Sequence, residues 1–218
     1  MTPTGTRGPI ISLSLPKSGT TTLAVALRHA GLKVADWRIR RHETETVALH
    51  DQLIGPLMYE DYFRSGDPLA RLGEFDAITE MNAVNKNLSV WPQMDSGILA
   101  AIQEHYPQVR FLLSKRDPER VANSIMNWNN LGKERLPRAD VPGLPRPFGG
   151  EVSDLVRWVK GHYAFCETVF RDNPNFLAYE LEAPDVRDRI SDFLGLPMPW
   201  WGAANTTQDW IETQRQDG

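Results

Sequence analysis

The stretch Ile10-Ile11-Ser12-Leu13-Ser14-Leu15-Pro16-Lys17-Ser18-Gly19-Thr20-Thr21-Thr22-Leu23 organises this chain. Its first half is a short aliphatic run, which predicts a buried strand. Pro16 cannot donate to a sheet and Gly19 permits a tight turn, so the strand ends there. A helical apolar pattern then begins at Leu23 and runs to Gly31, a residue type that is common just after a helix. The stretch therefore predicts a strand, a loop and a helix.

The loop between this strand and helix carries a lysine and several hydroxyl groups. Backbone N–H groups at a helix start point outward with partial positive charge, so they favour an anion. An ordinary βα turn with a surface lysine is the simpler alternative, but this combination favours a phosphate or sulfonate site. The residues that would hold the anion are Lys17, Ser18, Gly19, Thr20, Thr21 and Thr22.

This loop is not a Walker A motif, because its lysine precedes the glycine by two residues. The run Pro16-Lys17-Ser18-Gly19-Thr20-Thr21 instead resembles the 5′-phosphosulfate loop of the sulfotransferase family. Those enzymes use 3′-phosphoadenosine 5′-phosphosulfate (PAPS) as sulfuryl donor. The family often has a tryptophan after the threonine pair, where it packs on the adenine. This chain has Thr22 at that position, so the adenine contact must come from elsewhere.

The size and composition are those of one soluble domain. The chain has 218 residues, of which 41% are hydrophobic, and we expect a single domain over 1–218. No run has the length of a membrane span, and the N-terminus lacks a charged and then apolar signal segment. Residues 1–9 resemble a short flexible lead. We therefore expect a cytoplasmic enzyme with no transmembrane segment.

The charge balance and the cysteine count exclude several classes of site. Lys and Arg number 24 against 28 Asp and Glu, for a net charge of −4, which argues against broad nucleic-acid binding. Cys166 is the single cysteine, so neither an internal disulfide nor a cysteine-based metal site can form. No His, Asp and Glu set with the spacing of metal ligands stands out, and no metal is expected.

A second core strand is predicted over 75–80, and it ends in the carboxylate of Glu80. In open parallel sheets, ligands bind outside the carboxyl ends of the strands, which makes Glu80 a candidate site residue. Residues 81–91 would then form an irregular active-site loop. Helices are predicted on either side of this region, over 42–54 and 92–105.

A third strand over 109–114 is followed by a predicted helix over 119–128. Arg116 lies at the strand exit and Ser124 two turns into the helix, so both side chains can reach one anion. The run from Arg116-Asp117-Pro118 to Ser124-Ile125 is similar to the 3′-phosphate motif of sulfotransferases in residue type and spacing. Two phosphate-binding motifs in the order that the family has them indicate membership of that family more strongly than either motif alone.

Residues 129–150 are rich in Pro, Gly and Arg and have no clear periodicity. Such a long connection predicts a lid or a disordered loop. The family resemblance places it near the acceptor site. The side chains that suggest an acceptor pocket with aromatic walls are Tyr59, Tyr62, Phe63, Met81, Trp91 and Trp128.

The C-terminal part predicts a helix over 151–171, a strand over 176–179 and a helix over 184–194. Tyr179 and the glutamate after it resemble the family's Tyr-Glu pair, whose tyrosine can contact the adenine ring. A half-buried strand tyrosine is the alternative interpretation. Asn205 stands where several sulfotransferases have an asparagine-containing nucleotide contact, so it is added to the candidate donor site.

The alternation of strands and helices predicts an α/β fold. The resemblance makes it a P-loop-type three-layer α/β/α domain with a central parallel sheet. It also implies a PAPS-dependent sulfotransferase that moves a sulfuryl group to an acceptor hydroxyl or amine by in-line displacement and releases 3′-phosphoadenosine 5′-phosphate (PAP). Lys17 would stabilise the leaving phosphate. Glu80 would be the base, with His50 and Glu60 in reserve.

Two other functions stay open at this point. The first is a P-loop nucleotide-dependent kinase or NTPase, which would need Mg²⁺ and a Walker A lysine. The second is a noncatalytic nucleotide-binding module that has lost its acceptor site. The acceptor itself fits a small molecule, a lipid or a glycan equally well, and the sequence does not determine the oligomeric state.

Overall fold

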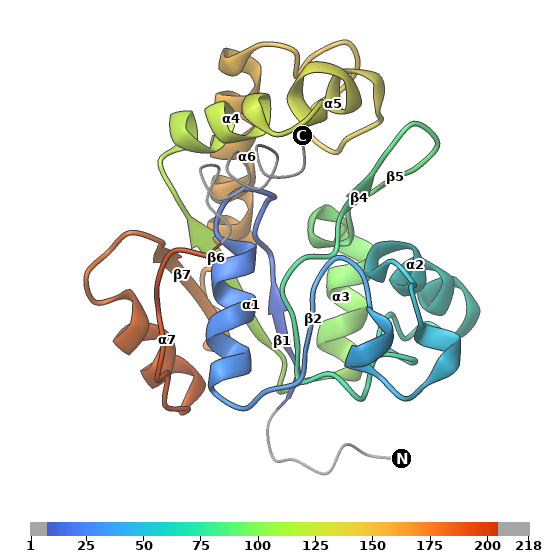
Figure 1. The fold of residues 1–218 in the computed structure, drawn as a ribbon, viewed down its shortest axis with the longest axis vertical. Coiled ribbons are helices and arrows are strands. Elements are labelled where there is room, and N and C mark those ends of the chain that lie inside the picture. Colours follow the sequence, from blue (N-terminus) through green and yellow to red (C-terminus); the bar gives the residue numbers. More distant parts are fainter. Residues whose placement is uncertain (1–7, 205–218) are drawn as a thin grey trace, which may run out of the picture.

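A computed structural model describes residues 8–204 of the chain. Its centre is a five-stranded sheet in the order β2-β3-β1-β6-β7, in which every pair is parallel (Figure 1). The expected lead falls largely on residues 1–7, and it lies with Asn205 outside the described residues. The strands of the sheet are β1 (Ile10–Ser12), β2 (Val34–Ala35), β3 (Ala77–Ile78), β6 (Arg110–Lys115) and β7 (Phe176–Glu180).

Helices cover both faces of this sheet, because successive strand residues point to opposite sides. Ile10 and Leu112 pack with α1 (Thr20–His29) and α7 (Val186–Leu194). Ile11 and Phe111 belong to the core on the other face. The helices that supply that second core are α3 (Ser96–His105), α4 (Pro118–Asn127) and α6 (Val152–Val169). The predicted three-layer α/β fold is confirmed.

The end of β1 is tied to its neighbours before the chain turns into α1. The Ser14 hydroxyl oxygen accepts a hydrogen bond from the backbone N–H of Ser114, at 2.9 Å. The buried His162 ring donates to the carbonyl oxygen of Leu13, at 2.7 Å. Gly19 then adopts a left-handed conformation, with φ of 95°, and α1 begins at the next residue. These contacts fix the position of the loop that carries Lys17.

The helix predicted over 42–54 is wrong. Only two 3₁₀ turns form there, at Arg41–Glu43 and Val47–Leu49. Thr44 lies between them in an extended conformation, and its hydroxyl binds Glu74 at 2.8 Å. Threonine side chains that bond in this way favour turns over helix, which explains the difference.

Helix α2 (Ile54–Ser65) begins where the range predicted as a helix, 42–54, ends. Gly55 and Pro56 lie in its first turn, and proline is tolerated there because the first N–H groups of a helix have no partner within it. Residues 69–72 form a turn, in which the backbone N–H of Leu72 donates to the carbonyl oxygen of Leu69, at 2.9 Å. No helix within residues 8–204 has the length and apolar character to cross a membrane.

Two segments predicted to be irregular have regular structure. Residues 81–91 contain an antiparallel hairpin of β4 (Ala83–Val84) and β5 (Ser89–Val90). Residues 129–150 contain a π-helical turn, Leu131–Arg135, followed by the short α5 (Leu136–Arg138), so the lid region is not disordered. Figure 1 shows the hairpin, α4 and α5 at the same end of the molecule.

The hairpin and the lid region are joined directly. The Ser89 hydroxyl donates to the carbonyl oxygen of Asp140, at 2.6 Å. A terminal nitrogen of Arg135 donates to the carbonyl oxygen of Val84, at 3.2 Å. Each bond links a residue of the hairpin to a residue of the lid about fifty positions later. The two segments therefore form connected walls.

Candidate active site

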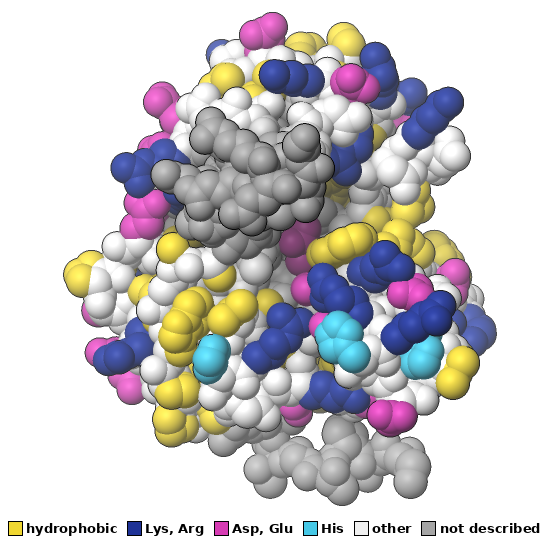
Figure 2. All heavy atoms as spheres, in the orientation of Figure 1, with side chains coloured by type: hydrophobic (Ala, Val, Ile, Leu, Met, Phe, Trp, Pro, Cys, Tyr) yellow, Lys and Arg dark blue, Asp and Glu magenta, His cyan; other side chains and the backbone are white. Residues whose placement is uncertain are grey.

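A cavity of about 910 Å³ opens at the carboxyl ends of the strands, where parallel sheets bind their ligands. Its walls come from the loop after β1, the residues after β2, β3 and β6, α4 with the segment that follows it, and the segment after β7. On the face of the molecule in Figure 2, cationic and anionic side chains are interspersed. The cavity, by contrast, is lined by residues that follow several different strands of the sheet.

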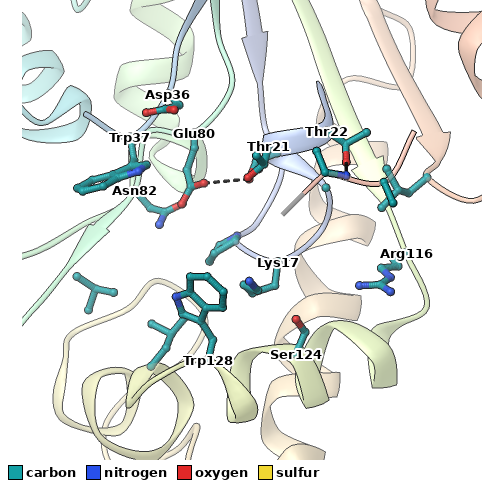
Figure 3. Close-up of a pocket in the computed structure, with 18 of the residues that line it drawn as sticks. Lys17, Thr21, Thr22, Asp36, Trp37, Glu80, Asn82, Arg116, Ser124 and Trp128 are labelled. Carbon is teal, nitrogen blue, oxygen red and sulfur yellow. Dashed lines mark hydrogen bonds between the residues drawn. The ribbon is translucent and has the colours of Figure 1, made fainter. Parts of the chain in front are cut away.

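Most of the predicted site residues meet in this one cavity. Figure 3 shows Lys17 between Trp128 on one side and Arg116 and Ser124 on the other, with Glu80 on the opposite wall. The predicted residues that line the cavity are Lys17, Gly19, Thr20, Thr21, Thr22, Glu80, Arg116 and Ser124. Residues separated by about a hundred positions are therefore brought together.

Two predicted residues do not line the cavity. Ser18 is buried, and its hydroxyl donates to the carbonyl oxygen of Leu15 at 2.5 Å. This bond holds the shape of the loop and turns the hydroxyl away from the cavity. Tyr179 is only 1% exposed and packs edge-to-face on Trp201, with ring centres 6.0 Å apart. Trp201 does line the cavity.

Lys17 is held in a strained and partly dehydrated position. Its φ of 69° lies in the left-handed region, which costs free energy for a residue other than glycine. Its ammonium lies 3.3 Å from the centre of the Trp128 ring, a cation–π contact. Burial lowers the pKa of Lys17 to about 8; Glu80 opposes this shift and Arg116 adds to it. The lysine is thus largely charged at pH 7 but is easily deprotonated.

Glu80 follows β3 and accepts a hydrogen bond from the Thr20 hydroxyl, at 2.9 Å. Burial raises the pKa of this carboxyl group. The Thr20 hydrogen bond opposes that rise, the nearby Asp36 adds to it, and Lys17 and Asn82 oppose it. A carboxylate with a raised pKa is a stronger proton acceptor than an exposed one.

Arg116 stands at the exit of β6, where its guanidinium is held by Glu182. Arg116 Nε donates to one carboxylate oxygen of Glu182 at 3.1 Å, and Arg120 donates to the other at 2.6 Å. Asp117 caps α4 by accepting from the backbone N–H of Arg120 at 2.9 Å, with Pro118 in the first turn as predicted. Arg116 and Ser124 both line the cavity, so an anion between them would compete with Glu182.

The reserve bases lie elsewhere. The His50 ring donates to the carbonyl oxygen of Thr44 at 3.0 Å, and Glu60 pairs with Arg71 at 2.9 Å. Neither lines the cavity. Of the residues that suggested an aromatic pocket, Trp128 alone does so. Within residues 8–204, no group of three or more His, Cys, Asp or Glu side chains is arranged to hold a metal ion.

Several cavity residues were missed by the sequence reasoning. Asp36 and Trp37 follow β2, so the rule that selected Glu80 could have found them. Arg40 lies beside them and pairs with Asp36 at 3.0 Å. The loop over 81–91 and the lid over 129–150 are predicted near the site, but no sequence pattern selects single lining residues within them. The lining residues from those two segments and from the C-terminal part include Asn82, Asn85, Leu131, Arg135, Leu181, Glu182 and Trp201.

A family model described as "Sulfotransferase domain" matches residues 9–172, which is well over half of the chain. The chain belongs to the sulfotransferase family. A comparison with curated proteins gives no match. Among solved structures, this sulfotransferase-family chain is similar to mouse sulfotransferase SULT7A1 complexed with PAP, at 14% identity and a TM-score of 0.45. The match covers 97% of this chain and 64% of that one.

Proposed function

We propose that this protein transfers a sulfuryl group from PAPS to a hydroxyl or amine of an acceptor and releases PAP. One observation carries the proposal. The family's two phosphate motifs, represented by Lys17 and by Arg116 with Ser124, line one cavity together with the buried carboxylate of Glu80. A sulfuryl transferase needs cations near the leaving phosphate and a proton acceptor near the nucleophile, and this cavity holds both kinds of group.

The donor is proposed to lie along the wall formed by the loop after β1 and the start of α4. The backbone N–H groups at the start of α1, with Thr21 and Thr22, would hold the 5′-phosphosulfate. Arg116 and Ser124 would hold the 3′-phosphate. This arrangement is supported by their common position on the cavity surface.

The adenine contact is proposed to come from Trp201 in place of the tryptophan that the loop lacks. Trp201 lines the cavity and is supported from behind by Tyr179. Tyr179 would then act through Trp201 and not touch the base. Because stacking of a base on an aromatic ring contributes about 1–3 kcal/mol, Trp201→Leu should weaken PAP binding by roughly 5- to 150-fold. Trp200→Leu is the matched control, because Trp200 stacks on His29 instead.

In the proposed reaction, the acceptor oxygen or nitrogen attacks sulfur while the bond from sulfur to the bridging phosphate oxygen breaks. The acceptor proton passes to Glu80. Negative charge that develops on the leaving phosphate is stabilised by Lys17 and by the N–H groups of the loop. The products are the sulfated acceptor and PAP, and the proton on Glu80 returns to solvent.

The test is a calorimetric titration of the purified protein with PAP in the absence of metal. We expect PAP to bind, and Arg116→Ala to weaken binding by roughly 10- to 100-fold through loss of charged hydrogen bonds. Arg116→Ala should not weaken binding of adenosine 5′-phosphosulfate, which lacks the 3′-phosphate. Arg157→Ala is the control, because Arg157 is exposed on α6 and does not line the cavity.

The same titration with ATP and Mg²⁺ tests the two other functions. Binding of ATP–Mg²⁺ with no response to PAP would favour a kinase or NTPase. PAP binding with no sulfuryl transfer to any acceptor, and no effect of Glu80→Gln, would favour a noncatalytic module. A cytoplasmic location and the absence of nucleic-acid binding stay predictions, which cell fractionation and a gel-shift assay test.

A further inference from the structure

Three arginines line the cavity, and one of them differs from the others. Arg40 is paired with Asp36 and Glu43, at 3.0 and 3.2 Å, and Arg116 is paired with Glu182 at 3.1 Å. Arg135 has no carboxylate partner among residues 8–204. Its single hydrogen bond there goes to the Val84 carbonyl oxygen at 3.2 Å, and its buried Nε has no partner. Arg135 is thus a cation in the cavity wall with no anionic partner in the described part of the chain.

Arg135 belongs to segments other than the two that carry the donor motifs. It ends the π-helical turn of the lid and bonds to the hairpin, which begins shortly after Glu80. Cavity residues from the same two segments are apolar or carry amide groups, namely Asn82, Val84, Asn85 and Leu131. An acceptor held by Arg135 would therefore lie beside the segment that carries the proposed base.

We infer that Arg135 binds an anionic group of the acceptor, so that the substrate is an alcohol or amine that carries a carboxylate, phosphate or sulfate. This inference rests on the proposed sulfuryl transfer. Arg135 is partly exposed, but its Nε is buried without a hydrogen-bond partner, which is costly, and an anionic ligand that accepts from this atom would remove that cost. The planar fork of arginine suits bidentate binding of these anions. Burial also lowers the pKa of Arg135, in keeping with a dehydrated cation.

Two other roles for Arg135 make different predictions. If it only fixes the hairpin through Val84, a neutral residue that keeps the hydrogen bond should be harmless. If it binds an anion of the donor, its loss should weaken PAP or PAPS binding. Arg135→Gln removes the charge and keeps an N–H donor on a shorter side chain, and loss of the Val84 bond alone should affect neutral and anionic acceptors equally. This substitution therefore separates the three roles.

The experiment uses matched acceptors that differ in one charged group. We propose 2-(4-hydroxyphenyl)ethanol as the neutral member, and 3-(4-hydroxyphenyl)propionate, 2-(4-hydroxyphenyl)ethyl phosphate and the corresponding sulfate ester as anionic members. A second series replaces the phenol by a primary amine. Binding to the PAP-saturated protein is measured by calorimetry, and turnover with PAPS gives KM and kcat. The three anions distinguish a carboxylate site from a phosphate or sulfate site.

We expect at least one anionic member to have a KM at least ~10-fold below that of its neutral counterpart. Arg135→Gln should raise that KM by roughly 10- to 100-fold, the range for lost charged hydrogen bonds, with kcat and PAP affinity within about 2-fold. Arg135→Lys should restore part of the loss. Arg138→Gln is the control, because it removes the same charge from the same segment, where Arg138 is exposed and pairs with Glu134 at 3.4 Å.

Several results would overturn the inference. They are equal use of neutral and anionic members, an unchanged KM in Arg135→Gln, a matching loss of PAP affinity in that variant, and failure of every member to bind the PAP complex. In each case, normal PAP binding by the unmodified protein would still support the proposed donor site. Failure of the unmodified protein to bind PAP would instead reject the proposed function itself.

Discussion

The ammonium of Lys17 lies 3.3 Å from the centre of the Trp128 indole ring. The lysine belongs to the loop after β1, and the tryptophan follows the last turn of α4. This contact therefore joins the two candidate phosphate-binding segments. It also removes water from the amine, whose pKa burial lowers to about 8.

Replacing Trp128 by leucine should weaken catalysis and change the response to pH. The loss of a cation–π contact worth about 0.5–2 kcal/mol predicts a roughly 2- to 30-fold fall in kcat/KM. Because burial is the largest cause of the low Lys17 pKa, its removal should move the alkaline limb of the rate profile upward. Trp37→Leu is the control, since Trp37 also lines the cavity but lies beside Asp36 and Asn82, apart from Lys17 (Figure 3). An unchanged alkaline limb would contradict this account.

The rate should depend on pH through Lys17 and Glu80. Glu80 must be ionised to accept a proton, so the rate should rise with pH through its raised pKa. Lys17 must be charged to stabilise the leaving phosphate, so the rate should fall above about pH 8. A profile of kcat/KM from pH 5 to 10 measures both limbs. Lys17→Arg, which stays charged throughout, should lower the rate and abolish the alkaline limb.

Replacing Glu80 by glutamine should separate chemistry from binding. Loss of a general base predicts a fall in kcat of about 10²- to 10⁴-fold, whereas the PAP dissociation constant should change less than about 2-fold. The glutamine oxygen can still accept from Thr20. Turnover and calorimetry on one preparation give both values. Glu60→Gln, at a carboxylate outside the cavity, should leave kcat unchanged.

The same variant should be more stable than the unmodified protein near neutral pH. The folded-state pKa of Glu80 is raised, so the unfolded state ionises first as the pH increases, and folding is disfavoured from that pH upward. We therefore expect Glu80→Gln to have a higher free energy of unfolding at pH 7 than the unmodified protein. Urea unfolding should show this gain vanish below the unfolded-state pKa. A gain that persists at pH 3 would point to another cause.

Replacing Glu182 by glutamine should strengthen PAP binding. Glu182 holds Arg116 and Arg120 at 3.1 and 2.6 Å, and a 3′-phosphate must compete with it for Arg116. These pairs are partly exposed, so we expect a gain of about 2- to 5-fold in affinity, in line with exposed ion pairs. AMP, which has no 3′-phosphate, should bind equally to both proteins. Glu167→Gln removes one of the two carboxylates that pair with Lys115, outside the cavity, and should leave PAP affinity unchanged.

Much of the site follows from the order of elements along the sequence. Parallel strands place their carboxyl ends at one edge, so the residues that follow β1, β3 and β6 must meet there. That rule selects Glu80, whereas the two strand-to-helix turns, which resemble family motifs, select Lys17 and Arg116. Both inferences depend only on where each strand ends, and short aliphatic runs in the sequence predict those ends.

Other features depend on contacts that no local pattern records. Tyr179 and Ala178 are neighbours on β7 but pack into the cores on opposite faces of the sheet. The register of β7 therefore decides which of its side chains is buried on which face, and a register shift of one residue would exchange them. Arg135 stands among other basic residues in the lid, and only its bond to Val84, 51 positions earlier, distinguishes it. Trp201 is brought to the cavity by its packing on Tyr179.

The bonds from Ser89 to Asp140 and from Arg135 to Val84 have an evolutionary consequence. They fasten the hairpin and the lid to each other, while β1, β6 and α1 carry the nucleotide loops. Residues 82–91 and 129–150 thus behave as one cassette that can be exchanged as a unit. We expect a chimera that receives both segments from one relative to acquire that relative's acceptor preference. A chimera that receives one segment alone breaks the joint between them.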